Sequence, residues 1–309
     1  MRIMNRFREW LLLLCLVSAL ASFAQQVPTE SCSSSGSCSS SGSCSPSGSC
    51  SSSGDCSSSD DRSSSGRRIV TNAQMMAVGS TNILDTYLSP EKYRGTAVAY
   101  ESQTERRKEG RQWSQQLVYY GELAFGRNRA DNANDMAGLL RFSYGMHRHW
   151  TLLDNRLELK AGALADLNIG FLYNTRNGNN PAQARLSVDL TPSASAAWRF
   201  AVGRTACKAV YEVAVPLAGV MFSPNYGQSY YEIFSRGNYD HNVVPTTVGC
   251  APSLRQLLAL DITLGRTALR LGYMGDVRQA EVNNLKQHTY NHMFVLGMVR
   301  RFTICRMQP

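Results

Sequence analysis

The sequence predicts an all-β protein, a single antiparallel up-and-down β-barrel of roughly ten strands and of the outer-membrane type. Three observations predict it. The first residues are organised like an export signal, the body alternates apolar and polar residues with period two, and turn-forming residues separate the alternating stretches. An error of one hairpin would change the count to about eight or twelve strands.

Residues 1–24 are predicted to be a cleaved signal peptide. A basic start is followed by an apolar stretch, 10–21, and by small residues at the third and first positions before Gln25. We place the cut after Ala24, with Ala21 as the second choice. The rival interpretation is an uncleaved membrane anchor, which needs about 18 or more apolar residues without such a site.

Residues 25–88 are predicted to be a flexible, low-complexity segment. Within it cysteines recur every six residues in Ser/Gly-rich sequence: Cys32, Cys38, Cys44, Cys50 and Cys56. With almost no large apolar side chain, the segment cannot offset the conformational entropy that ordering would remove. A repeat without dedicated chemistry, disulfide cross-links and binding of a soft metal all stay open, although the spacing differs from the close cysteine pairs of zinc sites.

The barrel domain is predicted over 89–309, with its body from about Arg94 to Ile304. The clearest strand is 156–174, where one parity is apolar and the other is polar or small. A strand sends the two parities to opposite faces, whereas a helix would distribute the charges around its circumference. The remaining predicted strands are 94–106, 116–125, 136–149, 185–190, 194–203, 207–222, 254–264, 269–276 and 288–304.

The polar parity favours a membrane barrel over a soluble one. It is rich in Gly, Ser, Asn and opposite charges, which suits a lumen, whereas a soluble barrel would present many Lys and Glu to water. Aromatic residues near strand ends resemble the interfacial girdles of membrane barrels: Tyr119, Tyr120, Tyr144, Trp150, Tyr173, Trp198, Tyr211 and Phe222. A soluble periplasmic lipid-binding barrel stays open as an alternative.

Several runs resemble a family of uncharacterised exported proteins from Bacteroides-like and Prevotella-like bacteria, catalogued as a domain of unknown function. The runs are Ser-Pro-Glu-Lys-Tyr at 89–93, the loop motif at 173–184, and the stretches 224–234, 237–242 and 251–256. The resemblance covers roughly Ser89 to Phe302 and leaves the Ser/Cys repeat outside. It implies an outer-membrane-type barrel and brings no catalytic residues.

The stretch 221–252 is predicted to be a long folded loop that either enters the lumen as a plug or caps the barrel. It carries the candidate ligand-binding residues Tyr226, Gln228, Tyr230, Tyr231, Phe234, Tyr239, Asp240 and His241. Rigid amphipathic aromatics suit sugars and lipids. The same side chains can also simply pack and fill a small barrel.

No catalytic residue, metal site or cofactor is predicted. The histidines are His147, His149, His241, His288 and His292. The pairs 147/149 and 288/292 each share a strand face, which could hold a metal or poise a serine, but no Gly-x-Ser-x-Gly or His-Glu-x-x-His motif accompanies them. Inward charges are expected to neutralise one another rather than line a pore: Arg156, Glu158, Lys160, Asp166, Arg199, Glu212, Arg255, Asp261, Arg270 and Asp276.

The formal net charge of +9 would suit nucleic acid, but export removes nucleic acid as a partner. The expected partners are outer-membrane lipids, lipopolysaccharide phosphates, the barrel-assembly machinery and a small-molecule ligand of unknown identity. The outer membrane is the expected location, with the periplasm as the alternative. Three functions stay open, in this order: a structural or ligand-binding barrel with a filled lumen, a narrow transport pore, and a small outer-membrane enzyme acting on lipid or lipopolysaccharide. About ten strands favour the first, because aqueous pores use 16 or more.

Overall fold

A computed structural model describes residues 67–178, 180–239 and 241–305. The predicted signal peptide, 1–24, and the cysteine repeat, Cys32–Cys56, lie outside the described residues. Within the described ranges, no helix is long and apolar enough to cross a membrane. The elements are β1 (Arg67–Asp85), β2 (Ser89–Lys108), β3 (Trp113–Arg127), β4 (Asn134–Leu152), β5 (Leu157–Asn174), β6 (Ala182–Val202), β7 (Thr205–Ala214), β8 (Ala218–Phe222), α2 (Tyr230–Phe234), β9 (Val243–Thr247), β10 (Leu254–Leu264), β11 (Thr267–Val282) and β12 (Leu285–Cys305).

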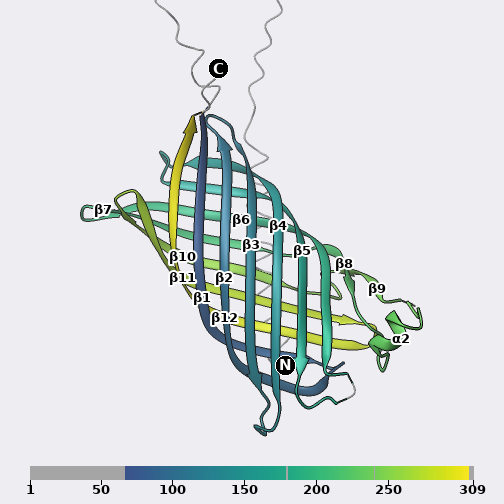
Figure 1. Cartoon of the computed structure of the whole chain (residues 1–309). Coiled ribbons are helices and arrows are strands. Elements are labelled where there is room, and N and C mark those ends of the chain that lie inside the picture. The colour runs from purple at the N-terminus through teal and green to yellow at the C-terminus, as the bar shows by residue number, and fades with distance from the viewer. Residues whose placement is uncertain (1–66, 179, 240, 306–309) are drawn as a thin grey trace, which may run out of the picture. The chain divides into compact units, whose positions relative to one another are not determined.

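The strands form a closed antiparallel barrel in chain order (Figure 1). Ten strands make the ring, because β1 pairs with β12 and β5 pairs with β6, while β8 and β9 form a further pair beside β6. This confirms the predicted all-β up-and-down barrel of ten strands.

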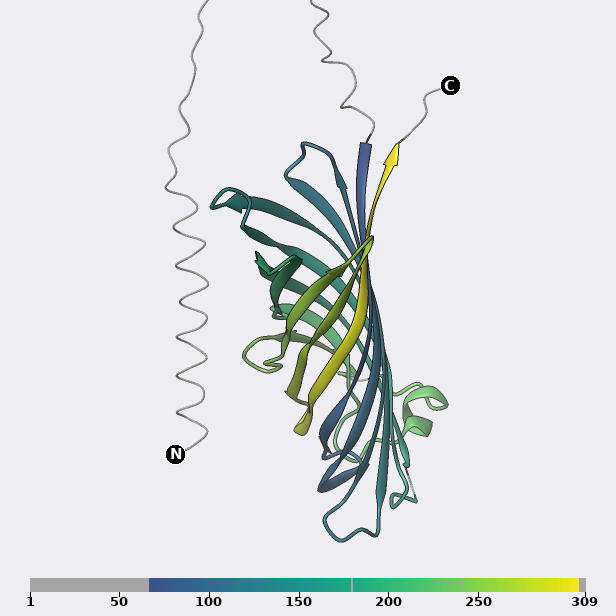
Figure 2. The same ribbon diagram turned by 90° about the vertical axis from the view of Figure 1, so that its left-hand side faces the viewer.

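The two ends of the barrel differ in the length of their connections. At the termini end, where Arg67 lies opposite Cys305, adjacent strands are joined by tight turns such as 203–204 and 265–266. The opposite end, called here the loop end, carries the longer connections 175–181 and 223–242. Figure 2 shows the strongly tilted strands running between these ends. Short turns at one end and longer loops at the other are typical of outer-membrane barrels.

The apolar parity faces outward and the polar parity faces the lumen, as predicted. On β3, Leu123 and Phe125 are about half exposed (49% and 53%), whereas the intervening Ala124 is 0% exposed and the preceding Glu122 only 4%. On β5, Ile169 and Phe171 are exposed while Asp166 is buried. The prediction that Tyr120 belongs to an interfacial girdle is wrong, because its side chain is buried inside the barrel and Arg141 lies over its ring.

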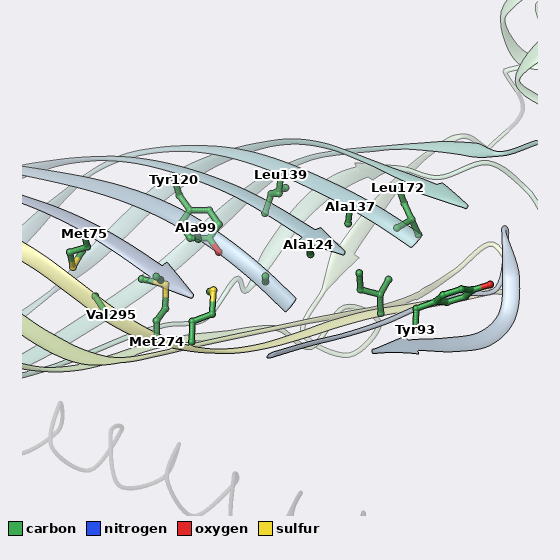
Figure 3. Packing of buried hydrophobic residues seen from close by; sticks show 14 of the residues in the cluster. Met75, Tyr93, Ala99, Tyr120, Ala124, Ala137, Leu139, Leu172, Met274 and Val295 are labelled. Atoms are coloured by element: carbon green, nitrogen blue, oxygen red, sulfur yellow. The ribbon is translucent and has the colours of Figure 1, made fainter. Parts of the chain in front are cut away.

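One side of the interior is apolar. Figure 3 shows Met75, Ala99, Met274 and Val295 pointing into the barrel from β1, β2, β11 and β12. On β1 the inward face is largely apolar and the outward face includes Gln74, Ser80 and Asn82. The usual distribution of polar and apolar residues is therefore partly reversed on this strand.

Three predicted boundaries are wrong, although the strand count is right. The barrel begins at Arg67, inside the segment 25–88 that was predicted to be flexible, rather than at 89 or 94. The stretches 185–190 and 194–203 form one strand, β6. The stretch 207–222 is divided into β7 and β8 by a break at 215–217. The strand count is still right because the omission of β1 is offset by counting β6 as two strands.

Candidate functional site

Gln228 organises the loop 223–242 at the loop end. Its side chain is buried and bonds three parts of the loop: it accepts from the backbone N–H of Asn225 and from the amide of Asn242, and it donates to the carbonyl oxygen of Asn238. The backbone carbonyl oxygen of Gln228 accepts a 2.8 Å hydrogen bond from the hydroxyl of Tyr87, which lies in the β1–β2 turn. These contacts give Gln228 a structural role, and a ligand role for it stays a prediction.

Tyr230 fixes the short helix α2 against the strands. Its hydroxyl accepts a 2.7 Å hydrogen bond from the backbone N–H of Ala184, and its ring stacks on Phe234 with the centroids 6.1 Å apart. Phe234 also stacks on Phe222 of β8. A capping box begins the helix, because Ser229 and Glu232 exchange side-chain to backbone hydrogen bonds. These bonds to Ser229 hold the pKa of Glu232 below its usual range.

The loop fits the predicted cap and not the predicted plug. Figures 1 and 2 both place α2 beyond β8 and β9 rather than inside the ring of strands. The loop bonds to two turns of the loop end: Tyr87 contacts it from the β1–β2 turn, and the Asn283 amide of the β11–β12 turn donates to the carbonyl oxygens of Ser223 and His241. Burial, with the Tyr230 ring nearby, raises the pKa of Tyr87 to about 12.

The remaining candidate residues do not converge on one pocket. Tyr226, Tyr231, Phe234 and Tyr239 are each more than 60% exposed. Asp240 lies outside the described residues. His241 has a positive φ of 53°, and its backbone carbonyl oxygen accepts a hydrogen bond from the Asn283 amide, so its backbone helps to hold the loop in place. The seven described candidates thus divide into Gln228, Tyr230 and His241, which hold the loop, and the four exposed aromatics, which present a surface.

The lumen is crossed by polar contacts between opposite strands. Arg141 of β4 pairs with Asp276 of β11 at 3.3 Å, and these strands lie five places apart in the ring of ten. Strands β1 and β6 also lie five places apart in the ring, and Arg185 of β6 bonds Asp85 of β1 at 2.8 Å. A contact between opposite walls occupies the full width of the lumen.

Further ion pairs confirm that the inward charges neutralise one another. Arg278 bonds Glu122 at 2.7 Å and Arg255 bonds Asp166 at 2.5 Å. Members of the predicted set also pair as Arg270–Asp261, Lys160–Glu212 and Arg199–Glu158. Arg156 was wrongly included, since it is exposed in the turn before β5. The prediction missed Arg141 and Arg278, whose inward parity in β4 and β11 was the available signal.

Two histidines at the termini end each lie beside a serine. His149 Nε2 is 2.7 Å from Ser114 Oγ, and the same nitrogen is 3.1 Å from Glu105. His149 Nδ1 is 3.2 Å from Glu158. A carboxylate facing each ring nitrogen favours the doubly protonated imidazole, and such a ring cannot accept a proton from Ser114.

His147 is the second histidine that lies beside a serine, and the pair 147/149 was also a possible metal site. His147 Nε2 lies 2.6 Å from Ser193 Oγ, while its Nδ1 has no hydrogen-bond partner among the described residues. A general base of the triad type needs an orienting acceptor at that position. Within the described ranges, no group of three His, Cys, Asp or Glu side chains is arranged to hold a metal ion. We interpret both histidines as part of the polar filling.

The space left between these side chains is small. Cavities of about 140, 80 and 80 Å³ lie along the lumen. The first lies towards the loop end and the other two lie around Lys160, towards the termini end. Arg141 and Arg255, each ion-paired, line both of the first two cavities.

Comparison with known proteins identifies a family and a set of similar barrels. No curated protein matches the chain. Among solved structures, the translocator domain of autotransporter NalP from Neisseria meningitidis is 11% identical, with a TM-score of 0.38, covering 78% of this chain and 90% of that one. The outer membrane protease OmpT from Escherichia coli is 7% identical, with a TM-score of 0.42 and coverages of 77% and 97%. Ail, the attachment invasion locus protein of Yersinia pestis, is 9% identical, with a TM-score of 0.27 and coverages of 77% and 99%.

The family match is far more extensive than the predicted resemblance. It covers residues 11–309 and so includes the Ser/Cys repeat, which the resemblance over Ser89 to Phe302 left outside. The predicted membership of a family of unknown function is confirmed, while the bacterial source stays a prediction. The chain belongs to the family described as protein of unknown function (DUF3316).

Proposed function

We propose that the chain is an integral outer-membrane barrel with a closed lumen, serving as a structural or ligand-binding protein at the cell surface. The contacts between opposite strands carry this proposal. Arg141–Asp276 and Arg185–Asp85 each span the lumen, and each pair is buried or partly buried. A charge in a narrow barrel is far more stable when paired than when it lines an empty channel.

The outward surface supports the membrane location. Long strands present exposed apolar side chains such as Leu140 (65%), Leu190 (54%) and Phe294 (58%). A soluble protein rarely exposes so much contiguous apolar surface. By the usual orientation of such barrels, the termini end faces the periplasm and the loop end faces the medium.

The ligand-binding part of the proposal rests on the outer aromatics of the loop end, Tyr226, Tyr231, Phe234 and Tyr239. Arg236 accompanies them, and its guanidinium lies over the Tyr231 ring at 5.6 Å. Aromatic rings beside guanidinium groups suit a phosphorylated glycolipid such as lipopolysaccharide. Replacing the four aromatics with serine is expected to lower lipopolysaccharide binding in native mass spectrometry without changing the heat-dependent gel mobility of the barrel.

Conductance in planar bilayers tests the closed lumen. The unaltered protein should show no stable ion current. The variant Arg141→Ser/Asp276→Ser/Arg185→Ser/Asp85→Ser should conduct, because it removes both of these contacts between opposite walls. The matched control is Arg270→Ser/Asp261→Ser, which removes a pair between neighbouring strands and leaves the contacts between opposite walls in place. Steady current through the unaltered protein would instead establish the narrow pore.

A further inference from the structure

The wall of the barrel is interrupted between β9 and β11. Strand β11 pairs with β10 only as far as Val277, opposite Leu254, and then continues to Val282. Strand β9 pairs with β8 and, in the described part of the chain, has no strand on its other edge. We call the flanking segments 248–253 and 278–282 the seam.

Few bonds hold the seam together. The backbone N–H of Glu281 donates to the Cys250 carbonyl oxygen at 2.8 Å, and that of Gln279 reaches the Ser253 hydroxyl at 3.5 Å. In a regular antiparallel ladder every second residue exchanges two backbone bonds with its partner, whereas Gln279 and Glu281 each donate a single bond here. The seam is therefore held by fewer bonds than a regular ladder of the same length.

Prolines favour this interruption. Pro245 lies within β9, Pro252 lies two residues before β10, and Pro216 lies in the break between β7 and β8. Proline has no N–H to donate, so it is confined to edge strands, bulges and strand beginnings. Each of these positions therefore lacks one backbone donor that a regular ladder would use.

The cavity of about 140 Å³ lies directly behind the seam. Its lining includes Ala251 and Ser253 on one flank and Gln279 and Ala280 on the other. Arg185 and Arg255 also line it, as do the carboxylates of Asp166 and Asp189, which are bonded to Arg255 and Asn168 respectively. On the outer side of the seam, Glu281 is exposed and pairs with Lys286 at 3.3 Å, while Val243 of the neighbouring β9 is 70% exposed.

The lining contains hydrogen-bond donors without acceptors. The Nε atoms of Arg185 and Arg255 are buried and, among the described residues, have no hydrogen-bond partner. An acceptor group brought by a ligand would satisfy them. The cavity volume resembles that of an engineered cavity of about 150 Å³ that binds benzene.

We propose that the seam is a lateral entrance through which a small, mostly apolar carboxylate, of about the size of benzoate, reaches this cavity through the side of the barrel. The contacts between opposite walls close the lumen along its axis, and the loop 223–242 covers the loop end. With these two directions closed, a ligand can reach the cavity through the seam.

The test uses 4-fluorobenzoate as the probe and the full barrel in lipid nanodiscs. Glu281→Cys places a thiol beside native Cys250, in a background whose other cysteines are serine, because bonded backbones at these positions bring the two residues within disulfide range. In the reduced protein we expect broadening of the ¹⁹F resonance. Oxidation should abolish the broadening and reductant should restore it.

Two further variants make the result decisive. A control disulfide from Leu258→Cys and Tyr273→Cys joins outward residues of the intact β10–β11 ladder and should leave the broadening unchanged. Ala280→Leu fills the cavity without altering an arginine and should remove the broadening. Equal broadening in oxidised and reduced protein, or in Ala280→Leu, overturns the lateral entrance, as does its absence from the reduced protein. Conductance of the same preparations separately tests the closed lumen.

Discussion

The Arg270–Asp261 pair offers a quantitative test of how the buried charges contribute to stability. Arg270 Nε and Nη2 donate to the two Asp261 oxygens at 2.6 and 2.8 Å, and the side chains are only 5% and 6% exposed. Removing one partner leaves the other charge buried, which costs about 3–5 kcal/mol. Replacing both with apolar residues of similar volume should cost much less.

The neighbours of the pair make the two single variants unequal. Lys208 lies directly opposite Asp261 across the β7–β10 ladder, so Asp261 keeps a nearby cation in Arg270→Met. In Asp261→Leu, Arg270 keeps a long contact of 3.7 Å to the Met75 sulfur. We therefore expect Asp261→Leu to lose about 5 kcal/mol of unfolding free energy and Arg270→Met about 3.

The assay is urea unfolding in detergent micelles, with the folded fraction read from the mobility of unboiled samples on gels. The double variant Arg270→Met/Asp261→Leu completes the cycle. Its loss should be smaller than the sum of the two single losses by about 3 kcal/mol. A double loss equal to that sum would refute the argument, because it would mean that the two side chains do not interact.

Three smaller perturbations address the backbone and the loop. Gly79→Ala should destabilise the barrel by about 1–3 kcal/mol in the same urea assay, because an added side-chain carbon would meet the His292 carbonyl oxygen of β12; unchanged stability would contradict this register. Ser229→Ala removes the N-cap of α2, worth about 1 kcal/mol, and should speed proteolysis within 223–242, whereas Ser229→Asp should not. The pKa of Tyr87 is raised to about 12 from an unfolded value of about 10, so its contribution is complete below pH 10 and is lost as the pH rises to about 12. Proteolysis of the loop should accelerate across that window, and a Tyr87→Phe variant, lacking the titrating hydroxyl, should show no such change.

Period-two alternation predicted the strands whose two faces differ most in polarity. β3 and β5 carry Glu122 and Asp166 inward beside outward Leu123 and Leu167, so their parity is visible in the sequence. β1 was missed because Met75 faces inward and Met76 outward, which leaves no contrast between the faces. Pro192 in the middle of β6 suggested two strands, but it is tolerated where the partner changes from β7 to β8.

The polar filling was predictable only in part. Parity shows that Arg255 and Asp166 face the lumen, yet their pairing depends on the ring order and register of strands far apart in the chain. One flank of the seam, 248–253, was likewise hidden at the end of the predicted loop 221–252, since β9 is only five residues long. Its prolines were the available signal.

The pairing of β1 with β12 has a consequence for how the barrel is made. Arg67 lies opposite Cys305, so the contact that completes the ring joins segments from the two ends of the described chain. Closing so long a loop is entropically unfavourable and slows folding. Until Leu285–Cys305 arrives, every intermediate carries two unpaired strand edges, which are templates for aggregation. Assembly therefore has to be completed last at the β1–β12 junction, and a chaperone that shields these two edges would act on the slowest step.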